Sequence, residues 1–336
     1  MPAALQKLAV VGAGAWGSAL ASSCRKAGRE VTLWGRDAAV VEAVARRHEN
    51  PAYLPGIALA PDIRATTDLG DLAAAELCLL VVPAQVLRPV AASLAAVLGV
   101  GVPVVLCAKG IEADSGLLMT EVAGALLPGH PLAVLSGPTF AAEVARGLPT
   151  AVTLAATDPA VAARLAESLG SRSFRPYVSD DPIGAEIAGT VKNVLAIACG
   201  IVAGRRLGDN ARAALVTRGL AEMTRLALAR GGKLATMMGL AGLGDLTLTC
   251  TATQSRNYGF GVALGQGHSP EAALGASRGV VEGRFSAAAV VAMAGRFAIE
   301  MPICAAVDAV VNRGADIDAS IAGLLARPFK AEGFSA

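Results

Sequence analysis

The chain has 336 residues, of which 54% are hydrophobic and 17% charged, and its formal net charge is +2. This length favours two domains, each large enough to bury a core, and the apolar composition excludes a disordered chain. Acidic and basic residues are mixed along the sequence without a basic stripe, so we expect no nucleic-acid partner.

The first half of the sequence alternates short apolar runs with helical segments. A helix is expected after the first apolar run, ending near Ala27 with Gly28 as its cap. Continuous apolar runs are typical of strands that are covered on both faces, so this half predicts an α/β, Rossmann-like, doubly wound parallel sheet. The predicted strands are Leu8–Gly12, Val31–Trp34, Leu77–Val82, Val102–Cys107, Leu132–Leu135 and Ala151–Ala155.

The second half shows helical patterns and no strand signal beyond Val178. Helices are predicted over Ile183–Val202 and over Asn210–Ala229, with Asn210 as the N-cap of the latter. Further helices are expected from Pro270 and from Phe285. The chain is therefore divided into an α/β domain over residues 1–181 and an all-α domain over residues 182–336, joined at the Ser179–Pro182 turn.

The longest uncharged stretch, Pro89–Ala108, is long enough to cross a bilayer, but Gly99, Gly101 and Pro103 divide it, so we expect no integral membrane segment. Met1 leads directly into a strand, which argues against a signal peptide. The scattered cysteines predict neither a disulfide framework nor a metal site and favour a reduced cytoplasmic location. These cysteines are Cys24, Cys78, Cys107, Cys199, Cys250 and Cys304.

The sequence Gly12-Ala13-Gly14-Ala15-Trp16-Gly17 follows a predicted strand and opens a predicted helix. In such a motif Gly12 permits a tight turn, Gly14 lets the backbone approach a pyrophosphate, and Gly17 lets the helix pack closely on the sheet. The helix N-terminus then offers free N–H groups to the phosphates. This pattern predicts a dinucleotide site; the alternative is a glycine turn without a ligand.

The end of the second predicted strand bears on which dinucleotide binds. Arg36 can meet a 2′-phosphate, which favours NADP(H) as the preferred cofactor. Asp37 lies twenty residues after Gly17, where an acid can contact a ribose, so NAD(H) is expected to be tolerated. The alternative is a solvated Arg–Asp pair on a loop.

Reduction of a carbonyl by hydride also needs a proton donor. Lys192 is a lone charge inside the apolar helix predicted over Ile183–Val202, and desolvation there should lower its pKa towards working pH. The alternative is a lysine whose stem lies along apolar surface with its head in water. We expect His48, His130 and His268, all in turn-like segments, to be surface residues.

Other polar groups follow the predicted strands or lie in turns of the second half. Lys109 comes directly after Val102–Cys107, at the ligand-binding edge of an open α/β sheet, and Ser136–Phe140 holds a similar place. Asp245 lies in a glycine-rich turn. Ser255-Arg256-Asn257 can clamp a phosphate, and its alternative is a helix cap with a solvated arginine.

Taken in order, these motifs resemble the bacterial NAD(P)-dependent glycerol-3-phosphate dehydrogenases. The resemblance implies reversible reduction of dihydroxyacetone phosphate to sn-glycerol 3-phosphate for glycerophospholipid synthesis. It also implies a Rossmann domain followed by a helical domain like the C-terminal domain of 6-phosphogluconate dehydrogenase. The motifs are Gly12–Gly17, Asn50–Gly56, Lys109–Gly110, Ser136–Glu143, Thr190–Val194, Gly242–Leu246, Ser255–Asn257 and Val280–Gly283.

The resemblance further implies roles for individual residues, with Lys192 as the proton donor and acceptor. The substrate-contact positions are Lys109, Gly137, Thr139, Lys192, Asp245, Ser255, Arg256 and Asn257. The cofactor-contact positions are Gly12, Gly14, Ala15, Trp16, Gly17, Arg36, Lys109, Ala141, Arg256, Val280 and Glu282. Pro83-Ala84-Gln85 departs from the family pattern, which leaves the contact with the centre of the cofactor open.

Two other functions remain open at this point. The chain can be another member of the 6-phosphogluconate-dehydrogenase-like superfamily, such as a β-hydroxyacid dehydrogenase, or a dinucleotide sensor without catalysis. A sensor needs neither the buried Lys192 nor a second phosphate clamp. We expect a homodimer for this architecture, although no residue in the sequence identifies its interface.

Overall fold

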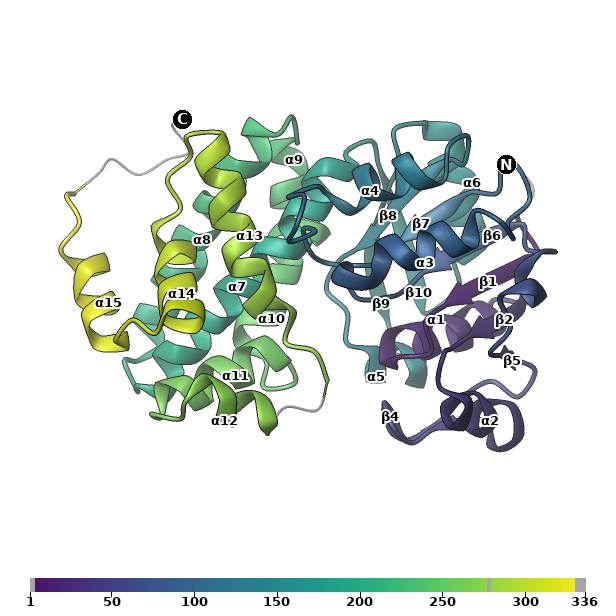
Figure 1. Cartoon of the computed structure of the whole chain (residues 1–336), viewed down its shortest axis with the longest axis horizontal. Coiled ribbons are helices and arrows are strands. Elements are labelled where there is room, and N and C mark those ends of the chain that lie inside the picture. Colours follow the sequence, from purple (N-terminus) through teal and green to yellow (C-terminus); the bar gives the residue numbers. More distant parts are fainter. Residues whose placement is uncertain (1–3, 277–278, 330–336) are drawn as a thin grey trace. The chain divides into compact units, whose positions relative to one another are not determined.

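The computed structural model describes residues 4–276 and 279–329, which divide into two compact units (Figure 1). The first unit contains the chain through Ala108 together with Met119–Pro182. The second contains Lys109–Leu118 together with the chain from Ile183 onward. The ten-residue Lys109–Leu118 segment therefore interrupts the first unit and belongs to the second, although it lies inside the expected domain over residues 1–181.

The first unit is built on an eight-stranded sheet in the order β10-β9-β8-β7-β6-β1-β2-β5. All neighbouring strands are parallel except β8 and β9, which are antiparallel. Strands β9 and β10 therefore run in the direction opposite to the other six. The expectation of a parallel sheet is correct for those six strands and wrong for the direction of β9 and β10. The strands are β1 (Lys7–Val11), β2 (Glu30–Trp34), β5 (Arg64–Thr66), β6 (Leu77–Leu80), β7 (Val104–Leu106), β8 (Leu132–Ser136), β9 (Thr150–Ala155) and β10 (Phe174–Ser179), beside a small hairpin of β3 (Glu49–Asn50) and β4 (Leu54–Ala58).

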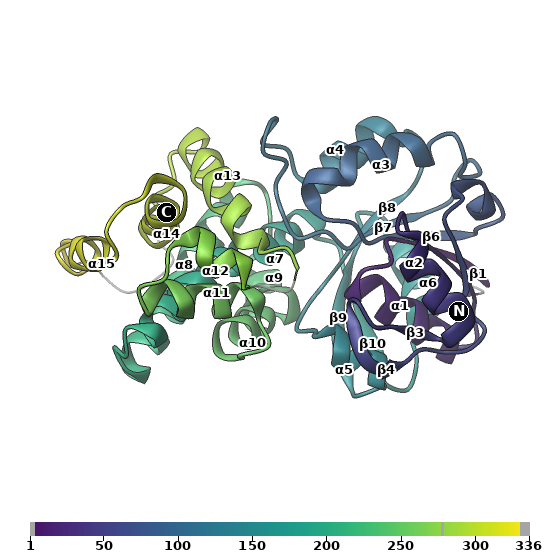
Figure 2. The same ribbon diagram turned by 60° about the horizontal axis from the view of Figure 1, so that its bottom comes forward.

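Helices cover both faces of this sheet, as the buried apolar strands require. In Figure 2, α3 and α4 lie on one face and α1 and α6 on the other. This arrangement confirms the predicted Rossmann-like layers. The helices are α1 (Ala15–Lys26), α2 (Ala38–Arg47), α3 (Leu87–Leu94), α4 (Met119–Leu126), α5 (Ala141–Arg146) and α6 (Pro159–Leu169), with 3₁₀ turns η1 (Leu69–Leu72) and η2 (Ala84–Val86).

The second unit contains helices and no strand within its described residues, which confirms the predicted helical half. The predicted Asn210 cap was wrong: α8 begins at Asp209 after Gly208, which has a φ of +89° and provides no side-chain cap. The helices are α7 (Pro182–Gly204), α8 (Asp209–Ala229), α9 (Leu234–Met238), α10 (Asp245–Thr251), α11 (Arg256–Gly265), α12 (Pro270–Gly275), α13 (Glu282–Arg296), α14 (Pro302–Arg313) and α15 (Ile317–Leu325), with a π-helical turn η3 (Leu240–Gly244).

Helix α7 is the core helix of the second unit. It is long and apolar enough to cross a membrane by composition alone, but 89% of its most apolar stretch is buried in the protein. Its side chains contribute to one apolar core with those of α8, α10, α11, α13 and α14. A helix buried in this way shows the apolar pattern of a membrane span because neighbouring protein, in place of lipid, surrounds it.

Helices α7 and α11 cross with their backbones in contact. A Cβ atom added to Gly200 on α7 would lie 2.2 Å from the carbonyl oxygen of Tyr258, and one added to Gly261 on α11 would lie 2.2 Å from that of Ile197. Gly204 and Gly265 repeat this close approach one turn further along. The crossing therefore admits only glycine, and it fixes α11 against the helix that carries Lys192.

Candidate active site

The glycine-rich turn of the first unit places its three glycines in different environments. Gly12 has a φ of +120°, and a Cβ atom there would lie 2.3 Å from the carbonyl oxygen of Val81. A Cβ on Gly17 would lie 1.8 Å from the carbonyl oxygen of Gly12, whereas one on Gly14 would meet no atom within 4 Å. Gly12 and Gly17 are thus needed for packing, and Gly14 faces open space at the N-terminus of α1.

The first turn of α1 fits an anionic group. Gly14 is its N-cap and supplies no side-chain cap, and the turn contains no acidic residue. The exposed N–H groups and the positive end of the helix dipole therefore remain available for phosphate oxygens. Ala15 and Trp16 begin this turn, and Ala141 begins α5; all three pack against the core of the first unit.

Asn50, buried in β3, stabilises the glycine-rich turn through its side-chain amide. Its Nδ2 donates to the carbonyl oxygen of Ala13 at 2.9 Å and to Ser18 Oγ at 2.8 Å. In the sequence, Asn50 is the first residue of the Asn50–Gly56 motif, and nothing there predicts this role. The sequence shows only a polar residue just before Pro51. A contact with Ala13, 37 residues earlier, cannot be predicted from that position.

The Arg36–Asp37 pair lies directly after β2 and does not form the solvated ion pair that was the alternative. The Asp37 carboxylate is the N-cap of α2 and accepts from the backbone N–H of Ala39 at 2.9 Å. Arg36 is exposed and forms no hydrogen bond or ion pair with the described residues. The guanidinium is thus available to a ligand, whereas the carboxylate already has a structural role.

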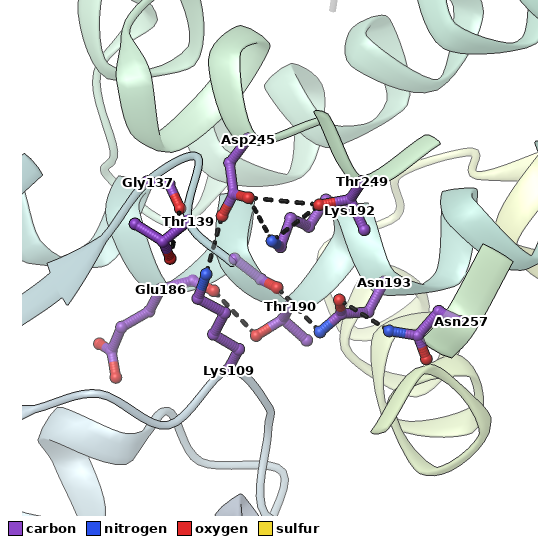
Figure 3. A network of polar contacts seen from close by, with 11 residues as sticks. Lys109, Gly137, Thr139, Glu186, Thr190, Lys192, Asn193, Asp245, Thr249 and Asn257 are labelled. Atoms are coloured by element: carbon purple, nitrogen blue, oxygen red, sulfur yellow. Dashed lines mark hydrogen bonds and ion pairs between the residues drawn. The ribbon is translucent and has the colours of Figure 1, made fainter. Parts of the chain in front are cut away.

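In the second unit, two lysines share one carboxylate (Figure 3). Lys192 Nζ donates to Asp245 Oδ1, and Lys109 Nζ donates to Asp245 Oδ2 at 2.9 Å. The Asp245 side chain is 0% exposed, that of Lys192 6% and that of Lys109 19%. Three residues that sequence analysis singled out separately are therefore brought together, and the Lys192 ammonium is buried, contrary to the alternative of a head in water.

Burial and the neighbouring charges set the protonation of this cluster. Burial lowers the pKa of Lys192 to about 7, and the adjacent Lys109 charge adds to this, although Asp245 opposes it. Burial disfavours the charged Asp245, but the two ammonium groups outweigh it and hold the pKa of that carboxyl below its usual range. Burial by itself would lower the pKa of Lys109, but the Asp245 carboxylate has the larger effect and raises it. Lys192 is thus the member of the cluster that exchanges a proton near neutral pH.

Thr249 completes the cluster and was missed by the sequence analysis. Its Oγ1 accepts from Lys192 Nζ at 2.9 Å and donates to Asp245 Oδ1 at 3.2 Å. Thr249 lies one helical turn after Asp245 on α10, so both side chains face Lys192. A signal was present in the four-residue spacing, but α10 itself was not predicted.

The Ser255–Asn257 motif begins α11. Ser255 Oγ accepts from the backbone N–H of Tyr258 at 3.3 Å, so the helix-cap alternative is correct for this residue. Asn257 is buried, where its Nδ2 donates to Asn193 Oδ1 and its Oδ1 accepts from the N–H of Gly283, both at 2.9 Å. Arg256 is exposed between them. The motif therefore has structural contacts and also presents a guanidinium to solvent.

Val280 and Glu282 lie at the start of α13. Val280 is exposed, and Glu282 is the first residue of the helix. Burial raises the pKa of Glu282 to about 7, against the opposing charges of Arg256, Lys109 and Lys192. Glu282 therefore belongs to the same electrostatic neighbourhood as the lysine cluster.

Gly137 and Thr139 belong to the first unit and follow β8. Gly137 has a φ of +139°, and Thr139 Oγ1 donates to its carbonyl oxygen at 3.3 Å. The expected substrate residues are thus divided between the units, with Gly137 and Thr139 in the first and the other six in the second. Of the histidines, His268 is exposed, whereas His48 and His130 are partly buried, so the expectation of surface positions is only partly met.

Comparison with known proteins covers both units. Residues 7–162 match the family described as NAD-dependent glycerol-3-phosphate dehydrogenase N-terminus, and residues 181–322 match its C-terminus. A relative from Rhodospirillum rubrum named glycerol-3-phosphate dehydrogenase (NAD(P)+) is 56% identical over 332 residues, covering 98% of this chain and 95% of the relative. The chain belongs to this family. A second relative of the same name, from Parvibaculum lavamentivorans, is also 56% identical and is covered over its whole length.

Solved structures of the family agree with the fold. A crystal structure of glycerol-3-phosphate dehydrogenase from Coxiella burnetii is 40% identical, has a TM-score of 0.92, and is matched over 96% of this chain and 99% of that chain. D-mandelate dehydrogenase with NADH is 15% identical with a TM-score of 0.62, a likeness of fold alone. Membership of the glycerol-3-phosphate dehydrogenase family therefore replaces the broader superfamily alternative.

Within this family framework, the departure at Pro83–Gln85 lies just after β6. Pro83 precedes the short turn η2, which begins at Ala84 and leads directly into α3. The sequence change is thus confined to the beginning of a helix on one face of the sheet. It does not involve the lysine cluster, which belongs to the second unit.

Proposed function

We propose that the chain catalyses the reversible NAD(P)H-dependent reduction of dihydroxyacetone phosphate to sn-glycerol 3-phosphate. The observation that carries this proposal is the buried Lys192 ammonium on Asp245, with its pKa lowered to about 7. The names of the full-length relatives point to the same reaction. A proton donor of this pKa can act at physiological pH, as a reductase of carbonyl groups requires.

The nicotinamide dinucleotide supplies the hydride when it is bound. The open space at Gly14 and the uncapped α1 would hold its pyrophosphate, because a side chain there would occupy that space. Arg36 would meet a 2′-phosphate, which supports a preference for NADP(H) with NAD(H) accepted. The other residues proposed to line this site are Gly12, Ala15, Trp16, Gly17, Lys109, Ala141, Arg256, Val280 and Glu282.

Lys192 delivers the proton in this mechanism. As the carbonyl carbon gains hydride, the ammonium donates one proton to the oxygen, which becomes the hydroxyl group of the product, and Lys192 is left neutral. Asp245 and Thr249 orient Nζ during this transfer. In the oxidative direction the neutral amine accepts the hydroxyl proton, so the same residue serves both directions.

The substrate phosphate is proposed to bind at the start of α11. Arg256 offers an exposed guanidinium, whose planar donors suit phosphate oxygens. Ser255 still has its hydroxyl hydrogen, since it accepts in its cap bond, and Asn257 still has a second amide hydrogen. Lys109, Asp245, Gly137 and Thr139 are proposed to orient the hydroxyl end of the substrate.

The test is the loss of NADPH absorbance when dihydroxyacetone phosphate is added, repeated with NADH. β-Hydroxyacids with NAD(P)+ serve as comparison substrates. We expect rapid oxidation of NADPH with dihydroxyacetone phosphate. With hydroxyacids we expect no reduction of NAD(P)+. Turnover of hydroxyacids alone would reject the proposed substrate, and tight NADPH binding without any turnover would support a sensor.

We also propose a cytoplasmic homodimer that supplies glycerophospholipid synthesis and binds neither nucleic acid nor membrane. The burial of α7 supports the last point, since this helix forms part of a protein core. The division into domains over residues 1–181 and 182–336 is retained as a description of the chain, with Lys109–Leu118 contributed to the helical unit. Light scattering coupled to gel filtration tests the dimer, and a monomer mass would reject it.

A further inference from the structure

The Lys109–Leu118 segment, named here the Lys109 loop, is closed by its own hydrogen bonds. The N–H of Glu112 donates to the carbonyl oxygen of Leu117 at 3.0 Å, and that of Gly116 donates to Glu112 at 2.8 Å. Ser115 Oγ donates to the Glu112 carboxylate at 2.6 Å. These bonds tie Ser115 and Gly116 to Glu112, which lies three residues from Lys109.

The base of this loop is anchored by apolar side chains. Ile111 and Leu118 pair through an isolated β-bridge, and both are 0% exposed in the core of the second unit. These two side chains fix the base of the loop. They do not fix the position of its tip, Ser115–Gly116, relative to the helices.

Arg296, the last residue of α13, contacts this tip. Its Nη1 donates to the carbonyl oxygen of Ser115 at 3.3 Å. The guanidinium also lies over Gly116, where a Cβ atom would be 2.6 Å from Nη1, and Gly116 has a φ of +68°. The turn at Gly116 is thus shaped to receive the arginine, and neither residue was singled out by the sequence.

We infer that Arg296 is a positioning residue for the reaction: by holding the tip of the Lys109 loop on α13, it keeps the Lys109 ammonium on the Asp245 carboxylate. This inference rests on the proposed function. Lys109 is the first residue of the loop and reaches a fully buried carboxylate at 2.9 Å. A looser loop lets this ammonium withdraw, and Asp245 then pairs with Lys192 alone.

The withdrawal of Lys109 changes the proton donor in a defined direction. The titratable groups that interact electrostatically with Lys192 are Asp245 and Cys250 on α10, Lys109 on the loop and Glu282 on α13, and Cys250 in turn contacts Cys199 on α7. Of these, Lys109 opposes the charged form of Lys192, and Asp245 favours it. Without Lys109 the Lys192 ammonium retains its proton to higher pH.

The experiment compares Arg296→Ala with Arg225→Ala in the full chain. Arg225 is the matched control because its Nη2 also donates to a backbone carbonyl oxygen, that of Glu300 at 2.9 Å, in the same unit. We expect Arg296→Ala to lower kcat/KM for dihydroxyacetone phosphate on the order of 10- to 100-fold and to move the alkaline limb of the pH–kcat profile to higher pH. Arg225→Ala should leave both unchanged, at a similar melting temperature.

A double-mutant cycle with Lys109→Ala separates positioning from a general structural effect. If Arg296 acts through Lys109, adding Arg296→Ala to Lys109→Ala causes no further loss. Fully multiplicative losses, a wild-type rate in Arg296→Ala, or a lowered kcat with an unmoved pH limb would each overturn the inference. If Lys109→Ala is too slow to measure, the pH limb of Arg296→Ala decides. A wild-type chain that does not reduce dihydroxyacetone phosphate rejects the proposed function itself and the inference with it.

Discussion

A single buried carboxylate, Asp245, pairs with two ammonium groups and compensates the charge of only one of them. Removing one partner of such a buried pair leaves an uncompensated charge, which is more unfavourable than losing an exposed ion pair. Because both lysines contact the same side chain, the proton affinity of each depends on the other. Because the cluster lies in the second unit, substitutions in it should change the rate of the reaction and leave the fold of the first unit intact.

Replacing Lys192 by alanine should abolish turnover and leave NADPH binding nearly intact. Loss of a positioned general acid typically reduces a rate by about 10²- to 10⁴-fold, and the glycine-rich turn that would hold the dinucleotide lies in the other unit. Steady-state kinetics and a fluorescence titration with NADPH measure the two properties. Wild-type kcat in this variant would remove Lys192 from the mechanism.

The pH dependence of the two directions should be opposite. Reduction needs protonated Lys192, whose pKa is lowered to about 7, so kcat for reduction should hold below this pH and decline above it. Oxidation needs the neutral amine, so its kcat should decline as the pH falls below about 7. Initial rates in both directions over one buffer series test this, and parallel profiles would contradict it.

Thr249→Val should lower kcat about tenfold, because it removes a hydrogen bond to Lys192 and leaves that donor less well oriented. Thr251→Val on the same helix is the control, since among the described residues Thr251 Oγ1 donates to the carbonyl oxygen of Thr247, at 2.7 Å, and not to Lys192 or Asp245. Equal kcat values in the two variants would show that the Thr249 hydroxyl does not orient the amine.

Part of the site could be predicted because its residues depart from their local sequence. Lys192 is a charge in an apolar helix, and the glycines at 12, 14 and 17 follow a strand. Thr249 and Asn50 carry no such local contrast, since threonine and asparagine are common in turns and on surfaces. Their roles arise from contacts across 57 and 37 residues, which one sequence does not encode locally.

At the scale of elements, the crossing of α7 and α11 shows how glycines replace side-chain packing. Gly261→Ala should destabilise the protein by at least about 1 to 3 kcal/mol, because the new Cβ meets a backbone oxygen that cannot move aside. Gly259→Ala, two residues earlier on the same helix, meets nothing within 4 Å and should stabilise it by about 1 kcal/mol. Urea unfolding compares the two, and similar midpoints would contradict the close crossing.

The buried strands and long helices were predictable because their apolar runs are long. The run predicted at Ala151–Ala155 became β9, but its composition does not specify direction, and only its pairing with β8 reveals that it is antiparallel. The short helices α9 and α10 escaped prediction for a related reason. Each has five to seven residues, too few to show a helical period, and tertiary packing stabilises them.

At the scale of the whole molecule, the two units are interleaved in sequence. Ile111 lies between strand β7 and helix α4 of the first unit, yet it packs in the core of the second. Ile111→Ala should therefore destabilise the helical unit by about 2 to 5 kcal/mol. Hydrogen exchange should show lost protection in α7 and α10.

The control for that prediction is Ile63→Ala, a buried isoleucine in the core of the first unit. It should reduce protection in the sheet and leave α7 unchanged. If Ile111→Ala instead affected only β7 and its neighbouring strands, the assignment of the Lys109 loop to the helical unit would be wrong.

The interleaving also has a consequence for synthesis on the ribosome. Leu118 is translated 178 residues before Arg296, which at bacterial elongation rates is a delay of roughly 10 to 35 s. Helices α7 to α13, whose side chains form the core around Ile111 and Leu118, are translated within that interval, so the nascent Lys109 loop has none of them at its start. We expect ribosome-bound chains halted near residue 180 to be cleaved by protease in this loop, and such chains to be natural clients of chaperones that shield newly made apolar segments.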